Sequence, residues 1–209
     1  NTLGSIYQKE KNYFIAIKYF KKAVHLNPSL VTAKYNLGVT YHMVSDYEMA
    51  ITYYKMTLEL KPNFVLALNN IGIAYQELGN HMEGIKYFEK AIHFSPQFPE
   101  PIYNIGFSYE KINQIDKAIF YYEKVLSIKK DYINAIINLG NIWKKRDQIN
   151  KALNTYKKAL DYDNKNGDVH NNMGICYQDL NNLNYAIISY NKALKNNPNH
   201  QDAMNNIGV

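Results

Sequence analysis

Hydrophobic and polar residues along the chain follow a pattern that returns every 34 residues. The stretch Tyr35–Tyr41 reads Tyr-Asn-Leu-Gly-Val-Thr-Tyr, and related stretches begin at residues 69, 103, 137 and 171. Within each copy, apolar and small residues recur three and four positions apart, which places them on one face of an α-helix. A repeat of fixed length is typical of a solenoid, in which each unit buries its apolar face against its neighbours.

Each repeat is predicted to contain two helices. With Gly38 as position 8, the first helix covers roughly positions 2 to 14, and a short polar turn follows. The second helix carries a small residue at position 20, an aromatic residue at 24 and a small residue at 27 in most copies. Position 8 is glycine in every copy: Gly4, Gly38, Gly72, Gly106, Gly140, Gly174 and Gly208.

Proline at position 32 is expected to end the second helix, because it lacks an amide hydrogen and disfavours helix before it. Lys130 and Asn164 replace this proline in two copies, where we expect the helix to run on further. The prolines are Pro28, Pro62, Pro96 and Pro198.

These residues resemble the tetratricopeptide repeat, a 34-residue helix–turn–helix unit. The resemblance implies an all-α fold, a right-handed α-solenoid of antiparallel helix pairs, over residues 1–209 as one array. The predicted copies are a partial repeat 1–30, full repeats 31–64, 65–98, 99–132, 133–166 and 167–200, and the start of a seventh at 201–209. Since neither end carries a polar cap, we expect the natural protein to continue past both ends.

Composition fits a folded protein, with 46% hydrophobic and 20% charged residues and a net charge of +6. Cys176 is the single cysteine, so no internal disulfide is possible, and we expect it to be buried. No apolar run reaches the roughly 18 residues of a membrane span, and we predict a cytoplasmic or nuclear protein without a membrane partner. The lysines at position 26 alternate with acids and predict a solvated outer face rather than a nucleic-acid site. They are Lys22, Lys90, Lys124, Lys158 and Lys192.

No catalytic motif was found: the chain has no glycine-rich phosphate loop, no His-Glu-x-x-His and no cysteine pair at metal spacing. The six histidines do not pair at the spacing of metal ligands on a helix. We therefore expect no catalytic residues, no metal site and no cofactor, and no enzyme activity in this chain.

Position 6 of the repeat is asparagine in six copies. A carboxamide has two donors and an acceptor, so it can pair with the N–H and C=O of a peptide backbone. The resemblance implies that the first helices line a concave groove, and position 6 lies off their packing face. Six asparagines occupy it: Asn36, Asn70, Asn104, Asn138, Asn172 and Asn206.

We call these six residues the asparagine ladder and predict that they bind extended peptides. Tyr35, Asn69 and Tyr103, at position 5, are predicted to border the ladder and to bind peptide as well. The alternative interpretation is structural, with each asparagine bonding to neighbouring helices. Both roles can hold for the same residue.

The ladder resembles the repeat arm of the O-linked N-acetylglucosamine transferases and of their SPINDLY-type O-fucosyltransferase relatives. That resemblance implies an arm that carries acceptor polypeptides to a catalytic domain outside this chain. The carboxylate clamp of chaperone-tail adaptors is absent, because position 5 has no lysine, and Glu100, Asp168 and Asp202 would repel a carboxylate.

The sequence therefore predicts a protein-interaction scaffold that binds extended polypeptides, in one form as the substrate arm of an intracellular O-glycosyltransferase. The alternative is a structural scaffold of a multiprotein assembly, whether ciliary, cell-cycle or chaperone-associated, that binds folded partners. Apolar repeat ends also allow self-association.

Overall fold

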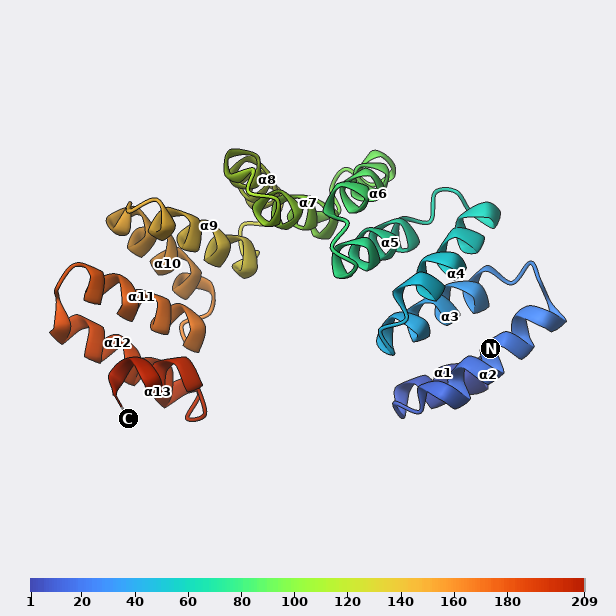
Figure 1. The fold of residues 1–209 in the computed structure, drawn as a ribbon, viewed down its shortest axis with the longest axis horizontal. Helices are drawn as coiled ribbons and strands as arrows, with labels where there is room; N and C mark the ends of the chain where they lie inside the picture. Colours follow the sequence, from blue (N-terminus) through green and yellow to red (C-terminus); the bar gives the residue numbers. More distant parts are fainter. Residues whose placement is uncertain (209) are drawn as a thin grey trace. The chain divides into compact units, whose positions relative to one another are not determined.

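The computed structural model describes residues 1–208, which form thirteen α-helices and no strand (Figure 1). Val209, the last residue of the predicted seventh copy, lies outside the described residues. The first helices of the repeats are α1 (Thr2–Lys9), α3 (Val31–Met43), α5 (Val65–Glu77), α7 (Pro99–Lys111), α9 (Ile133–Lys145), α11 (Gly167–Asp179) and α13 (Gln201–Ile207). The second helices are α2 (Tyr13–Leu26), α4 (Tyr47–Leu60), α6 (His81–Phe94), α8 (Ile115–Ile128), α10 (Ile149–Tyr162) and α12 (Leu183–Asn196).

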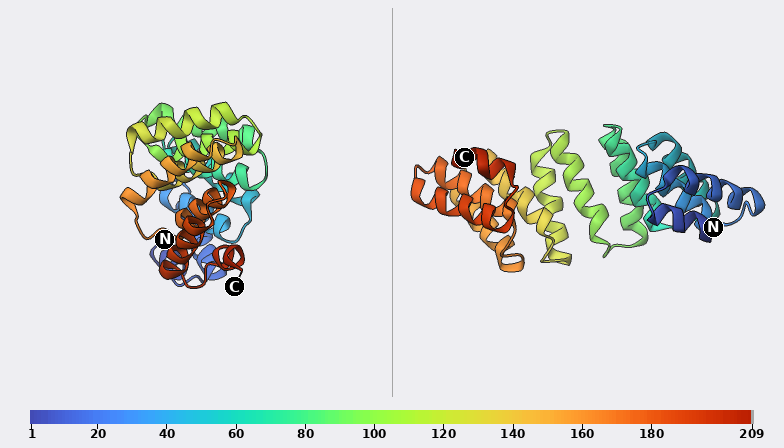
Figure 2. Two further views of the ribbon diagram at one scale, coloured as in Figure 1. Left: turned by 90° about the vertical axis from the view of Figure 1, so that its left-hand side faces the viewer. Right: turned by 90° about the horizontal axis from the view of Figure 1, so that it is seen from below.

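The chain forms two compact units, Asn1–Ala118 and Ile119–Val209, and the boundary falls within α8. In each unit, consecutive helices pack against each other, from α1 to α7 in the first and from α9 to α13 in the second. First helices also contact the first helix of the next repeat, α3 with α5 and α9 with α11. Figure 2 shows the helix pairs of each unit from two further directions. Each unit is thus a stack of helix pairs, with its first helices side by side.

The glycine at position 8 sets how closely the two helices of a repeat approach. A Cβ atom on Gly38 would lie 2.6 Å from the Tyr54 ring, and one on Gly140 would lie 2.4 Å from the Tyr156 ring. Carbon atoms in contact are normally 3.5–4.0 Å apart. The aromatic residue at position 24 therefore occupies the volume that a larger residue at position 8 would need.

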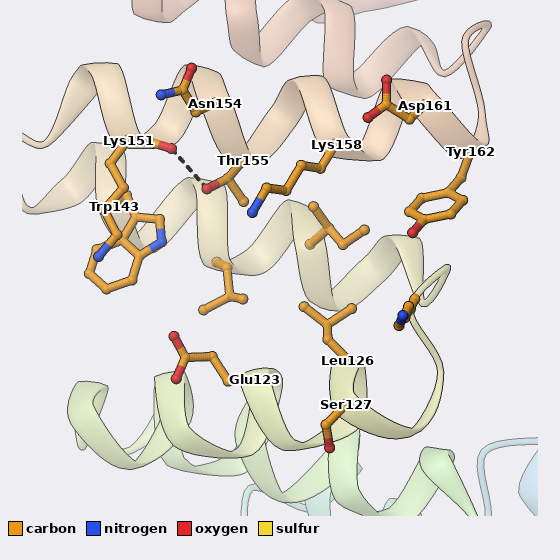
Figure 3. Close-up of a pocket in the computed structure, with 13 residues that line it drawn as sticks. Glu123, Leu126, Ser127, Trp143, Lys151, Asn154, Thr155, Lys158, Asp161 and Tyr162 are labelled. Atoms are coloured by element: carbon orange, nitrogen blue, oxygen red, sulfur yellow. Dashed lines mark hydrogen bonds between the residues drawn. The ribbon is translucent and has the colours of Figure 1, made fainter.

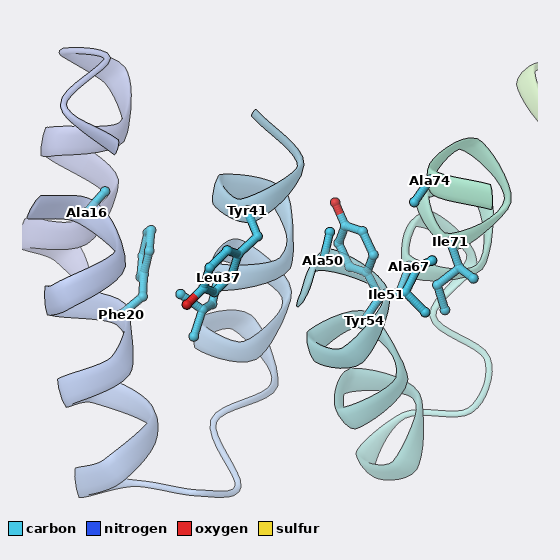
Figure 4. Close-up of a cluster of buried hydrophobic side chains, with 10 residues drawn as sticks. All are labelled: Ala16, Phe20, Leu37, Tyr41, Ala50, Ile51, Tyr54, Ala67, Ile71 and Ala74. Carbon is cyan, nitrogen blue, oxygen red and sulfur yellow. The ribbon is translucent and has the colours of Figure 1, made fainter. Parts of the chain in front are cut away.

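The core of the first unit continues from repeat to repeat. Figure 4 shows side chains from four successive helices in one buried layer. Small residues at position 20 allow close helix approach, and aromatic and aliphatic side chains fill the space beside them. The cluster comprises Ala16, Phe20, Leu37, Tyr41, Ala50, Ile51, Tyr54, Ala67, Ile71 and Ala74.

Proline does not determine where the second helix ends. We expected α8 and α10, which lack it, to run on, but both have the same 14 residues as α4 and α6. In every copy a hydrogen-bonded turn follows the helix, from the N–H of position 34 to the C=O of position 31. Tyr132 N donates to Lys129 O over 3.2 Å, and Phe64 N to Lys61 O over 3.1 Å. The expectation was wrong because this turn stops the helix with or without proline.

The turn between the two helices of a repeat uses a left-handed residue at position 15. Ser45 has φ 60°, Asp147 has φ 58°, and Gly79 has φ 74° at the same position. A side chain at positive φ costs free energy that glycine avoids. Most copies nevertheless have a residue other than glycine at position 15. The turn reverses the chain direction, so that the second helix packs against the first.

Candidate functional site

The ladder residues lie at the same place on six successive first helices. Five of them are half-buried, and Asn206 is exposed. Asn36, Asn70 and Asn104 belong to the first unit, and Asn138, Asn172 and Asn206 to the second. Each carboxamide therefore stands at the edge of the packed interior, where it can contact both protein and solvent.

From Asn70 onward, the ladder links each repeat to the one before it. Asn70 Nδ2 donates to Tyr35 Oη over 3.1 Å, and Asn104 Nδ2 donates to Asn69 Oδ1 over 3.2 Å. In both pairs the donor is at position 6 and the acceptor at position 5 of the preceding repeat. These bonds tie adjacent first helices together.

The second unit uses the same link and two others. Asn206 Nδ2 donates to Asn171 Oδ1 over 3.0 Å, again from position 6 to position 5. Asn172 Nδ2 donates to Asn141 Oδ1 over 3.3 Å, and Asn141 also accepts the Tyr156 hydroxyl over 2.6 Å. Asn138 Nδ2 donates to Tyr122 Oη over 3.0 Å. The structural role considered for position 6 is therefore present in both units.

These links leave hydrogen-bonding capacity on the ladder. A carboxamide has two N–H donors and a carbonyl acceptor, and one inter-repeat bond uses a single N–H. The Asn36 side chain is half-buried and bonds to no other described residue, so its two donors and its acceptor are unused within the protein. The ladder can therefore hold its own repeats together and still offer polar groups to a ligand.

Position 5 contributes more to the interior than we expected. Asn69 is only 6% exposed, and the Tyr35 ring meets Phe64 edge-on with 4.9 Å between ring centroids. Burial raises the pKa of Tyr35 above its ordinary value, and the hydrogen bond from Asn70 lowers it. Tyr103 is half-buried. Within the protein, Tyr35 accepts from Asn70, and Asn69 accepts from Asn104 and donates to Asn70 Oδ1 over 3.4 Å. Their predicted contact with a peptide stays a prediction.

A second set of polar links was not anticipated. Gln8 Nε2 donates to Thr40 Oγ1 over 3.0 Å, and Gln76 Nε2 donates to Ser108 Oγ over 2.7 Å and to Asn104 O over 2.9 Å. The two bonds to hydroxyl groups run from position 12 of one repeat to position 10 of the next, and the bond to Asn104 O reaches the backbone at position 6. The signal in the sequence was a hydroxyl residue at position 10, within the apolar face of the first helix.

Other candidate chemistry is sparse. The position-26 lysines are all exposed. Between residues 1 and 208, no three histidine, cysteine, aspartate or glutamate side chains gather as metal ligands. Over the same residues, no helix is both long and apolar enough to cross a membrane.

Family comparisons agree with the helix pairs. Profiles described as tetratricopeptide repeat match residues 31–64, 65–98 and 167–200, and also 1–30 and 99–132; a further TPR repeat profile matches 140–181. The chain belongs to the tetratricopeptide repeat family. The predicted fold class, an α-solenoid of antiparallel helix pairs, is confirmed.

Solved structures show the same tetratricopeptide fold at low identity. PilW, a type IV pilus biogenesis factor, is 19% identical, with 99% of this chain and 96% of PilW covered and a TM-score of 0.83. YrrB, a TPR protein with an unusual peptide-binding site, is 22% identical, with coverage of 91% and 98% and a TM-score of 0.65. The Cut9–Hcn1 structure of the APC/C is 18% identical over 99% of this chain and 41% of the other, with a TM-score of 0.75. Comparison with curated protein sequences gives no match.

Proposed function

We propose that this tetratricopeptide array is a protein-interaction scaffold whose asparagine ladder binds the backbone of extended polypeptides. The observation that carries the proposal is the recurrence of a carboxamide at position 6 in six successive repeats, with hydrogen-bonding groups at Asn36, Asn104 and Asn172 that their inter-repeat bonds do not use. Such a group recognises peptide N–H and C=O groups without reading side chains. Binding would therefore depend on the ligand's backbone more than on its sequence.

Spacing supports an extended ligand. Packed helices lie about 8–10 Å apart, so successive rungs are separated by about 10 Å. An extended peptide advances about 3.3 Å per residue, and one rung can serve every third ligand residue. The three rungs of each unit would hold about six residues.

A narrower form of the proposal is that the array is the acceptor-carrying arm of an intracellular protein O-glycosyltransferase, in the cytoplasm or nucleus. It rests on the uninterrupted asparagine from Asn36 to Asn206 and on the absence of a catalytic motif within the chain. In this form the array binds acceptor proteins and performs no chemistry itself.

A structural scaffold for folded partners is the second candidate. The observation that favours it is the inter-repeat bonding of the ladder, because Asn70, Asn104 and Asn206 each stabilise the stack without a ligand. Under this interpretation, ladder substitutions would affect stability and leave partner binding unchanged.

Peptide binding to ladder variants distinguishes the two candidates. The probe is a fluorescent pool of unstructured 12-residue peptides, titrated into wild type and into Asn36→Ala. A backbone hydrogen bond contributes about 1 kcal/mol, so the variant should bind about fivefold more weakly. The matched control is Asn191→Ala, an exposed asparagine on a second helix, which should bind like wild type.

Backbone-methylated peptides give the independent arm. Methylation at every third amide removes N–H donors but keeps all side chains. Starting at the first, second or third amide gives three methylated peptides, and at least one of them should bind more weakly than the unmethylated peptide. Equal affinity of all methylated peptides, or an Asn36→Ala affinity equal to wild type, would contradict recognition by the ladder and favour the structural scaffold.

A further inference from the structure

In the first unit, a pair of stacked tyrosines joins the first and second helices of several repeats. The tyrosine at position 23 of the second helix stacks on the tyrosine at position 11 of the first. Ring centroids are 5.5 Å apart for Tyr7 and Tyr19, 5.5 Å for Tyr41 and Tyr53, and 5.6 Å for Tyr75 and Tyr87. Lysines of the preceding second helix lie beside these pairs: Lys21 of α2 is 5.6 Å from the Tyr41 centroid, and Lys55 of α4 is 5.9 Å from the Tyr75 centroid.

Repeat 133–166 breaks this pattern. Position 11 is Trp143 and position 23 is Thr155, whose hydroxyl donates to Lys151 O over 2.8 Å. No ring from position 23 reaches the tryptophan. Repeat 167–200 also lacks the tyrosine, but there Tyr185 at position 19 lies against Tyr177, with 5.3 Å between ring centroids.

The missing ring leaves a cavity of about 540 Å³ in the second unit, between α8 and α10 (Figure 3). This volume lies within the range of ligand pockets, roughly 300–1,000 Å³. Its floor is formed by Ile136, Leu139 and Trp143 of α9, and Leu126 of α8 and Tyr162 of α10 complete its apolar lining.

Basic side chains flank this apolar floor. Lys151 Nζ lies 3.3 Å from the centroid of the Trp143 ring, and Lys158 extends from α10 toward the middle of the opening. Neither lysine forms an ion pair within residues 1–208. Asp161 also lines the cavity, but its carboxylate points away from the opening in Figure 3. Across the opening Glu123 is the one acid facing in, so the α10 side favours an anionic partner group.

We propose that this cavity docks an acidic amphipathic α-helix of a partner protein. All lining residues except Lys130, which follows α8, belong to three helices, whose backbone groups are paired within the helices. An extended peptide would lay unpaired N–H and C=O groups on the apolar floor, whereas a helix satisfies its own. From Lys151 to Tyr162 the cavity follows twelve residues of α10, about 16 Å, or three helical turns.

The partner helix would place apolar side chains at i, i+3 or i+4, and i+7 on the floor, as amphipathic helices do in apolar grooves. Its acidic flank would meet Lys151 and Lys158, which lie seven residues apart on one face of α10. This site is separate from the ladder and takes a helical rather than an extended ligand.

Trp143 is the only tryptophan of the chain, so its fluorescence reports occupancy directly. The probe is a synthetic 18-residue helix with leucine at the i, i+3, i+4 and i+7 positions and glutamate on both flanks. We expect it to shift the Trp143 emission and to saturate. The same helix with lysine in place of glutamate should bind at least tenfold more weakly, and a glutamate peptide broken by central prolines should not bind.

Thr155→Tyr restores the ring found in the first unit and should reduce the affinity for the glutamate helix at least tenfold. Its matched control is Thr52→Tyr, because Thr52 is exposed on α4 and donates to Glu48 O over 2.9 Å in the same i−4 geometry. Lys158→Glu tests the charge without filling the cavity, and it should reverse the preference between the two helices.

Each result decides the proposal. It is overturned if the glutamate helix fails to bind wild type, if it binds Thr155→Tyr as well as wild type, or if Lys158→Glu leaves the preference unchanged. Asn36→Ala should bind the glutamate helix like wild type, so failure of the ladder and failure of this site are distinguishable.

Discussion

The Asn104 carboxamide donates a hydrogen bond to Asn69 Oδ1, 35 residues earlier in the chain, over 3.2 Å. The donor is a ladder residue, and the acceptor is nearly buried beneath the following repeat. One side chain therefore joins two repeats and also stands where a peptide ligand is proposed to bind. The two interpretations of the ladder separate when stability and binding are measured on different rungs.

Asn104→Ala should destabilise the protein more than Asn36→Ala. Removing the Asn104 carboxamide leaves Asn69 Oδ1 buried without its donor, which costs about 1–3 kcal/mol. Asn36 makes no such bond, and its substitution should cost less than about 0.5 kcal/mol. Urea unfolding followed by circular dichroism measures both, and equal midpoints for the two variants would show that the inter-repeat bond contributes nothing.

Gly140→Ala should be strongly destabilising although alanine is the better helix former. The added Cβ would lie 2.4 Å from the Tyr156 ring, which is fully buried and cannot move aside freely. Overpacking of this kind costs about 1–3 kcal/mol, more than the roughly 1 kcal/mol that alanine gains from helix propensity. Thermal denaturation gives the sign, and a raised midpoint would rule out the close contact.

Ser45→Gly should stabilise the first unit by about 1 kcal/mol. Ser45 has φ 60° in the turn between α3 and α4, and glycine removes the cost of a side chain at positive φ. The reciprocal change, Gly79→Ser, alters the same repeat position, where φ is 74°, and should destabilise by a similar amount. Two shifts of the same sign in chemical denaturation would contradict the account of position 15.

Acidification should destabilise the protein through His42. Burial lowers the pKa of this imidazole below its ordinary 6.5, and Glu77 opposes the shift. Because the unfolded state then binds the proton more tightly, the stability is present above about pH 6.5 and is lost as pH falls below it. Between pH 7.5 and pH 5.5 the unfolding midpoint of wild type should fall more than that of His42→Gln. Parallel pH dependence in the two proteins would exclude His42 as the source.

Cys176 should resist thiol reagents in the folded protein. Burial raises the pKa of its thiol to about 11, from an ordinary value of 9.0. At pH 8 the thiolate fraction then falls about 100-fold, and the thiolate is the reactive form. Absorbance-monitored labelling with an aromatic disulfide should be slow in buffer and fast in denaturant, and rapid native labelling would contradict the buried placement.

The fold could be predicted almost completely from the repeat. The contact between the glycine at position 8 and the aromatic ring at position 24, such as Gly38 and Tyr54, determines how the two helices pair. Both residue types recur every 34 residues in the sequence. The ends of α8 and α10, at Ile128 and Tyr162, were not predicted correctly, because a hydrogen-bonded turn rather than proline follows them. That hydrogen bond joins two backbone groups, so no particular residue type in the sequence indicates it.

The candidate sites were predicted less completely. The ladder follows from position 6, but the burial of Asn69 and Asn171 does not, since it depends on how far the next repeat covers position 5. The cavity beside Trp143 has a sequence signal, Thr155 where earlier repeats have tyrosine. Recognising it required knowing that positions 11 and 23 stack, which only the structure provides.

Side-chain amide NMR tests the central claim most directly, because each asparagine gives its own NH₂ signals. A binding member of the 12-residue peptide pool is titrated into labelled protein, and the Asn36 and Asn172 signals are followed. The account predicts that both shift with the peptide's binding isotherm, while the exposed Asn150 and Asn191 signals remain in place. Saturable peptide binding with unmoved Asn36 and Asn172 signals would contradict it.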